Sequence, residues 1–88
     1  GLTAFEIITG AADVSYKNGV LKTAAAGQYL TLDNNVKVQL VNRDQKTVTE
    51  ISMDVAMVYA HGTNLNAPKD MVFELNELGY VCNLYVIE

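Results

Sequence analysis

The chain has 88 residues, of which half are hydrophobic and 18% are charged, and its formal net charge is −4. A chain of this length is expected to fold as a single domain, residues 1–88, and its apolar content can fill one core without disulfides or metal. The combination of low charge and abundant apolar residues also predicts exposed apolar surface, which assembly with another protein would cover.

The charges are unevenly distributed along the chain. Residues 1–44 hold four acids and four bases, whereas residues 45–88 hold six acids and two bases and carry the whole net charge. Binding to a nucleic-acid backbone needs clustered Lys and Arg, so we expect no nucleic-acid partner. We also expect no membrane partner, because no apolar run approaches roughly 18 residues. No signal-peptide pattern is present either, so we expect a soluble protein. Its compartment stays open, because a single cysteine does not indicate one, and the virion is one candidate location.

Turn residues recur at short intervals and predict short strands. Residues 5–9 are expected to form the first strand. Asn18-Gly19 predicts a two-residue hairpin turn between strands at 13–17 and 20–23, because a type I′ turn needs positive φ at both central residues. Residues 28–32 predict a further strand, which we expect to end at the polar residues 33–35.

Alternation of apolar and polar residues continues through the middle of the chain. Val36, Val38 and Leu40 predict one face of a half-buried strand. Residues 47–59 predict a long strand, because β-branched residues dominate its first part. A helix is the alternative there, with a capping box at Thr47-x-x-Glu50 and an apolar stripe formed by Val48, Ile51, Val55, Val58 and Tyr59.

Residues 67–78 fit two interpretations equally well. Pro68, Asp70 and Gly79 occupy positions typical of the first turn and the end of a helix. Alternation of apolar residues favours a strand instead, followed by a hairpin loop at 76–79. Residues 80–87 predict a last strand that is central and covered on both faces, because both of its faces are largely apolar. The predicted fold class is therefore mainly β, as an antiparallel sheet, sandwich or barrel-like domain with at most one short helix near 67–78, or α+β as the alternative.

Few residues carry candidate chemistry. His61 is the only histidine, and Asp54 or Asp70 could orient it only if the fold brings them close. Cys82, the only cysteine, lies in an apolar strand and is expected to be a small buried residue. Asp70, Glu74 and Glu77 would line one face of a helix and are expected to be solvated. No phosphate-binding loop or EF-hand pattern occurs, so we expect no catalytic residue, no cofactor and no metal.

Aromatic residues are the more suggestive feature, because tyrosine buries a large rigid ring while keeping a polar end in water. The sequence has five tyrosines and two phenylalanines. The residues that we expect at an interface are Tyr16, Tyr29, Phe73, Tyr80 and Tyr85.

These observations favour a structural or protein-interaction subunit that assembles with itself or with a larger protein scaffold, of which a virion or phage accessory protein would be one form. One alternative is a small acidic inhibitor that binds a basic surface of its target, since the second half of the chain is acidic. A second alternative is a small enzyme or ligand-binding module centred on His61.

Overall fold

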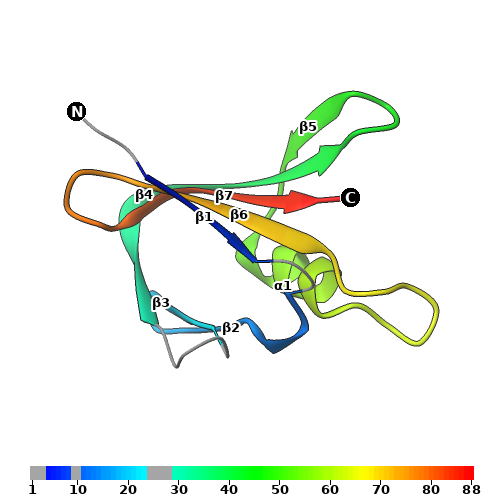
Figure 1. Ribbon diagram of the computed structural model, residues 1–88, viewed down its shortest axis with the longest axis horizontal. Coiled ribbons are helices and arrows are strands. Elements are labelled where there is room, and N and C mark those ends of the chain that lie inside the picture. Colours follow the sequence, from blue (N-terminus) through cyan, green and yellow to red (C-terminus); the bar gives the residue numbers. More distant parts are fainter. Residues whose placement is uncertain (1–3, 9–10, 24–28) are drawn as a thin grey trace.

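The computed structural model of the protein describes residues 4–8, 11–23 and 29–88, and it shows one strongly bent, mixed β-sheet with a single α-helix against it (Figure 1). The strand order is β1-β6-β7-β4-β3-β2, and β5 pairs with β4. The prediction of a mainly β fold with one short helix is confirmed. The elements are β1 (Ala4–Ile8), a 3-10 turn η1 (Ala11–Asp13), β2 (Ser15–Lys17), β3 (Val20–Lys22), β4 (Tyr29–Asn42), β5 (Thr47–Glu50), α1 (Met53–His61), β6 (Asp70–Leu75) and β7 (Val81–Ile87).

The sheet is mixed because its central pair, β4 and β7, runs parallel, while the other neighbouring strands are antiparallel. The prediction of an all-antiparallel sheet is therefore wrong on this point. Parallel neighbours need a crossover connection, and here β5, α1 and β6 supply it between β4 and β7.

Strand β4, with 14 residues, connects the two parts of the sheet. Its first residues pair with β3, and its last residues pair with β7 and β5. The register with β7 shifts between Leu32 and Lys37, where the Asn35 N–H donates to Asp33 Oδ2 at 2.9 Å. The polar residues 33–35 were expected to end a strand, but they produce an irregularity within one, and the strand bends there (Figure 1).

The predicted hairpin turn at Asn18-Gly19 is confirmed. Asn18 has φ of 52° and Gly19 has φ of 77°, as a type I′ turn requires. β2 and β3 pair across this turn, with Tyr16 opposite Leu21. This hairpin curls beneath the rest of the sheet, at the lower left of Figure 1.

The long strand predicted for residues 47–59 is wrong beyond Glu50. Residues 47–50 form β5 against β4, and the chain then turns into α1 at Ser52, whose Oγ accepts a hydrogen bond from the Val55 N–H at 3.2 Å. The helical alternative placed the cap at Thr47, but pairing with β4 occupies that residue. Ser52 is instead the N-cap, a role that serine favours.

The short helix lies at α1 and not near 67–78, where the structure has strand β6 followed by a hairpin loop. Met71 and Phe73 point into the core from alternate positions of β6. Asn76 organises the loop, because its Oδ1 accepts from the Leu78 and Tyr80 N–H groups. Gly79, with φ of 80°, serves this turn and does not end a helix. Tertiary pairing with β1 and β7 therefore selects the alternating interpretation.

The core lies between the sheet, α1 and the β2–β3 hairpin. It contains Leu21 from the hairpin, Ala56 and Ala60 from α1, and Phe73 and Leu84 from the two long strands. The two alanines allow the helix to approach the sheet closely, because they present little side-chain volume. One face of the sheet is thereby covered. No helix in the described ranges is long and apolar enough to cross a membrane.

Candidate interaction surface

The face of the sheet opposite the core forms the broadest candidate site. Residues directly opposite one another in neighbouring strands share a face of a sheet, and one such row runs Ile7, Val72, Tyr85, Gln39 and Glu50. A second row runs through Ile87, Val41 and Val48. We call this surface the open face; its members are Phe5, Ile7, Lys37, Gln39, Val41, Val48, Glu50, Asp70, Val72, Glu74, Asn83, Tyr85 and Ile87.

More than half of the open face is apolar. Ile7 and Phe5 on edge strand β1 are 69% and 58% exposed, and Val48 on β5 is 60% exposed. Between these two edges, Val72, Tyr85 and Val41 are half-buried. None of these side chains belongs to the described residues that pack in or against the core. The open face is thus an apolar band that crosses five strands.

The described elements that could cover the sheet, η1, the β2–β3 hairpin and α1, all pack on the face opposite the open face. Ala11 of η1, Leu21 of β3 and Ala56 of α1 all lie in the core. The prediction that β7 is central is confirmed by the strand order, with β6 and β4 as its neighbours. The prediction that both of its faces are covered is not met by the described residues, because only Val81, Leu84 and Val86 are buried.

The structure distributes the five predicted interface residues over different places. Only Tyr85 lies on the open face. Phe73 has no exposed surface and belongs to the core, so the structure corrects the expectation that it lies at an interface. Tyr80 lies at the end of the β6–β7 loop. Tyr16 and Tyr29 both lie near the β2–β3 hairpin. Tyr16 shares a face with its partner Leu21, and Tyr29 shares a face with its partner Lys22. Because Leu21 and Lys22 are consecutive in β3, the two tyrosines lie on opposite faces.

Most residues of the open face are not among those predicted from the sequence to lie at an interface. Phe5, Ile7, Val72, Ile87 and Val41 carry the surface, and each belongs to a stretch that alternates along a strand. The signal that could have found them is apolar character on both faces of neighbouring strands, which the analysis recognised only for the last strand and interpreted as burial.

His61 anchors the end of α1 to the segment before β2. Its Nε2 is paired with the Val14 carbonyl oxygen, and since a carbonyl can only accept, this nitrogen carries the proton. Asp54 lies about 10 Å away along the helix axis, by the rise of seven residues. Asp70 occupies an open-face position, whereas α1 packs on the covered face. The fold therefore does not bring the predicted His–Asp pair together.

Cys82 and the acidic residues adopt positions other than those expected. Cys82 is half-buried at the irregular point of the β6–β7 pairing, and its Sγ donates to the Glu74 carbonyl oxygen at 3.3 Å. Glu74 Oε1 accepts from Asn83 Nδ2 at 2.5 Å. Asp70 and Glu74 lie about 13 Å apart along β6, and Glu77 lies in the following loop. Among the described residues, no three His, Cys, Asp or Glu side chains gather closely enough to hold a metal ion.

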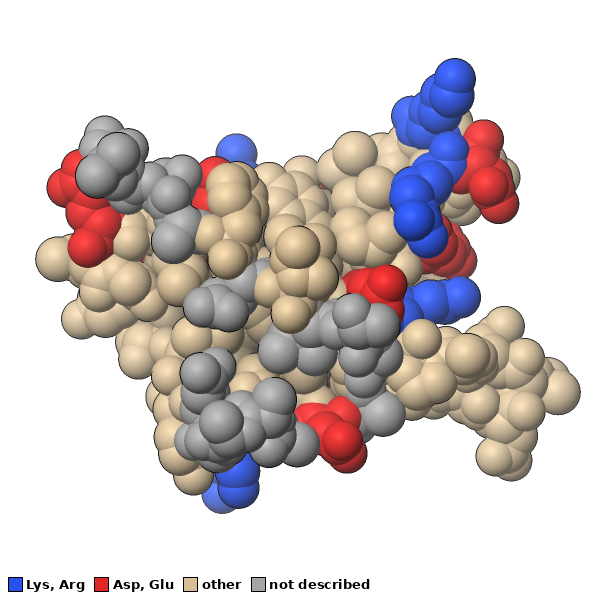
Figure 2. Space-filling model, in the orientation of Figure 1, with Lys and Arg blue, Asp and Glu red and all other residues tan. Residues whose placement is uncertain are grey.

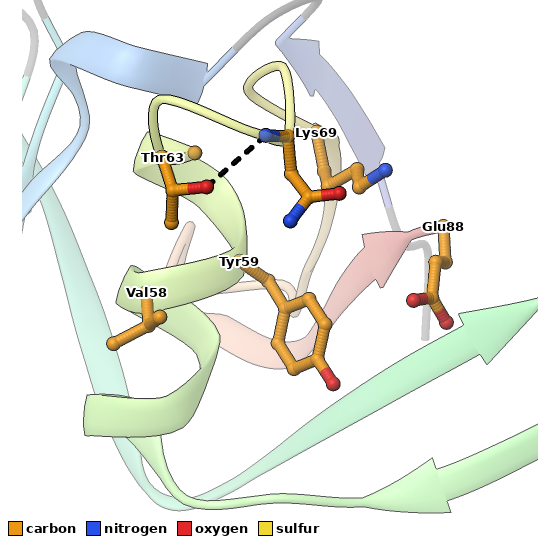
Figure 3. Close-up of a pocket in the computed structure, with 7 residues that line it drawn as sticks. Val58, Tyr59, Thr63, Lys69 and Glu88 are labelled. Carbon is orange, nitrogen blue, oxygen red and sulfur yellow. Dashed lines mark hydrogen bonds between the residues drawn. The ribbon is translucent and has the colours of Figure 1, made fainter.

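A small pocket of about 150 Å³ lies between the end of α1, the loop that follows it and Glu88 (Figure 3). The Tyr59 ring forms one wall, and Lys69 and Glu88 lie on the other side. Glu88 Oε2 accepts from Asn42 Nδ2 at 3.2 Å, which links this wall to β4. The volume is below the roughly 300 Å³ at which pockets begin to enclose drug-sized ligands.

The loop between α1 and β6 projects from the body of the protein as an arm, at the lower right of Figure 1. Thr63 organises it, because its Oγ1 accepts from the Leu65 and Asn66 N–H groups. Leu65 at the tip is 93% exposed. The arm is uncharged near its tip. On the visible face the basic atoms gather mainly at the upper right with acidic atoms beside them, and the other acidic atoms lie in separate places (Figure 2). The view therefore shows no continuous acidic surface of the kind the inhibitor hypothesis would use.

Comparison of the chain with models of protein families, with curated proteins and with solved structures gave no significant match in any of the three.

Proposed function

We propose that the chain is a non-enzymatic protein-interaction subunit that assembles with a second copy of itself through the open face. The observation that supports this most strongly is the apolar band that runs from Ile7 and Phe5 on β1 to Val48 on β5 with no described element over it. Contiguous exposed apolar patches that are rimmed by polar residues mark interaction sites.

The charges of the open face favour a copy of the chain as the occupant. Lys37 on β4 lies on this face together with three carboxylates, Glu50 on β5 and both Asp70 and Glu74 on β6. Two copies stacked face to face about a two-fold axis that runs along β7 would bring Lys37 of each subunit towards Glu74 of the other, because these two residues lie in the same row on either side of β7. Self-complementary patches of this kind are the rule in two-fold dimers.

The test is the solution mass of the chain, measured by light scattering on a sizing column over a concentration series. The wild-type mass is expected to rise from that of one chain to that of two. Replacement of Ile7 by lysine places a charge in the apolar band and is expected to give a monomer throughout. A wild-type chain that stays monomeric at every concentration would overturn self-assembly.

Val58→Lys is the matched control for Ile7→Lys. Val58 is an apolar residue of similar exposure, at 63%, but it lies on the solvent side of α1 and outside the open face. This variant should assemble like the wild type. If both lysine variants dissociate the dimer equally, the interface is not the open face.

A virion or phage accessory subunit would be one form of this function, in which a larger scaffold takes the place of the second copy on the open face. Ile7→Lys would then prevent binding to the scaffold as well. Pull-down with the wild type and the two lysine variants separates this form from simple dimerisation.

A further inference from the structure

The outer face of the β2–β3 hairpin forms a second surface, distinct from the open face. Ser15 lies opposite Lys22, Lys17 lies opposite Val20, and Lys22 lies opposite Tyr29, so these side chains share one face. Leu21, at the alternate position, points into the core. The residues of the outer face and Asn18 line a shallow hollow of about 420 Å³, which we call the basic hollow. Its lining residues are Ser15, Lys17, Asn18, Val20, Lys22 and Tyr29.

The basic hollow is positive in a protein whose net charge is −4. Its lining residues include Lys17 and Lys22 and no Asp or Glu. The sequence from residue 14 to residue 32 contains no acid at all. The two lysines are therefore not neutralised by a carboxylate within their own hairpin.

An exposed aromatic ring completes the hollow. Tyr29 is 66% exposed, and the Lys22 Nζ lies 5.8 Å from the centre of its ring, which is within the range of a cation–π contact. This contact orders the lysine over the ring without neutralising its charge. An incoming carboxylate would find the ammonium group already positioned beside an apolar floor.

The hollow adjoins a sheet edge. Strand β2 ends the strand order, and all three of its residues are exposed. Alternate backbone N–H and C=O groups of an edge strand point away from its partner, where an extended peptide can pair with them. Side chains of such a peptide at alternate positions would lie beside Ser15 and Lys17.

We propose that the basic hollow and the β2 edge together bind an extended, acidic peptide segment of a partner protein. Charge complementarity selects the acidic side chains, the edge strand selects an extended backbone, and Tyr29 packs against the apolar parts of the peptide. Two lysines are too few for the backbone contacts of nucleic acid, which depend on several neutralised phosphates. This site shares no residue with the open face and does not depend on the proposed self-assembly.

The test measures fluorescence anisotropy of a short labelled peptide in which glutamate alternates with valine, in about 0.02 M and about 0.15 M salt. We expect binding that weakens as salt rises, and at least tenfold weaker binding of the same peptide with lysine in place of glutamate. N-methylation of alternate peptide amides removes donors for strand pairing and should weaken binding about tenfold. An N-methylated peptide that binds equally well would overturn pairing with the β2 edge.

Variants of the protein locate the site. Lys17→Glu and Lys22→Glu are each expected to weaken peptide binding about threefold or more, because attraction becomes repulsion at an exposed pair. Lys37→Glu, the same charge change on the open face, should alter binding less than twofold. Equal effects of all three variants, or tighter binding of an oligothymidylate than of the acidic peptide, would overturn the proposal.

Ile7→Lys separates the two proposals. This variant should lose self-assembly and keep peptide binding, whereas Lys17→Glu should do the reverse. Loss of both properties in either variant would show that one surface serves both and would overturn the separate site.

Discussion

Both faces of the sheet carry apolar side chains, but they differ in what covers them, and the open face also holds polar and charged residues such as Lys37, Gln39 and Glu50. On strand β7, Leu84 and Val86 face the core and are fully buried, while Tyr85 and Ile87 between them lie on the open face and are half-buried. The covered face owes its burial to α1 and the β2–β3 hairpin. Alternation along a strand therefore tells which residues share a face, and the elements outside the strand decide whether that face meets protein or water.

The difference also explains why the open face and the core respond differently to substitution. A core side chain loses both its transfer free energy and its packing when it is truncated, whereas an exposed side chain loses little in the isolated chain. The open face should therefore influence assembly far more than stability.

The largest expected effect is the loss of unfolding free energy when a core side chain is truncated, compared with truncation of a side chain on the open face. Phe73→Ala should lower the free energy of unfolding by about 3–5 kcal/mol, because it leaves a cavity in the core. Phe5→Ala should change it by less than about 0.5 kcal/mol. Urea unfolding at a concentration where the chain is monomeric measures both, and similar losses would mean that Phe5 is covered in the monomer.

The next effect concerns the loop that connects the covering helix to β6. Gly62 has φ of 77°, and an added Cβ would lie 2.7 Å from both the Asn66 carbonyl oxygen and the Pro68 nitrogen. Gly62→Ala should cost about 2 kcal/mol or more, from positive φ and backbone overlap together.

Gly19→Ala is the matched control, because Gly19 has the same φ with open space around its Cα. It should cost about 1 kcal/mol, from the positive φ alone. Thermal unfolding monitored by circular dichroism compares the two variants, and equal shifts would show that the overlap at Gly62 relaxes without cost.

The cap of the covering helix should contribute a smaller amount. Ser52→Ala removes the oxygen that accepts from the Val55 N–H and should lower the free energy of unfolding by about 1 kcal/mol. Ser52→Asp keeps an acceptor at the same place and should retain the wild-type value. Urea unfolding measures both, and an equal loss in the two variants would exclude a capping role.

The last effect is of the same size as that of the cap, but it has the opposite sign and lies on the covered side. Thr23 is 1% exposed, and its Oγ1 has no hydrogen-bond partner among the described residues. Thr23→Val replaces this hydroxyl by a methyl group of similar shape and should raise the free energy of unfolding by about 1 kcal/mol. Thr23→Ser keeps the hydroxyl and should not stabilise. A destabilised valine variant would show that the hydroxyl is satisfied in solution.

The sequence by itself determined the elements whose signals are local. Asn18-Gly19 specified its hairpin, because few residues other than glycine and asparagine tolerate positive φ. Alternation located the second half of β4, the recurring turn residues delimited β1, and apolar character on both faces located β7. The mainly β class with a single short helix follows from these segments.

Tertiary structure decided the position of the helix. Residues 53–61 and 70–75 each carry patterns compatible with helix and strand. The first segment is helical because the pairing of β5 with β4 ends at Glu50, and the alanines at 56 and 60 pack closely against the sheet. The second became a strand because β1 and β7 offered hydrogen-bonding partners on both sides.

Tertiary structure also decided which apolar residues are available for binding. The aromatic residues chosen from the sequence ended in the core, in a loop, on the hairpin and on the open face, because residue type alone does not specify which side of a sheet a helix will cover. The composition predicted that apolar surface would remain exposed. Only the packing of α1 and the β2–β3 hairpin on one side of the sheet placed that surface on the other.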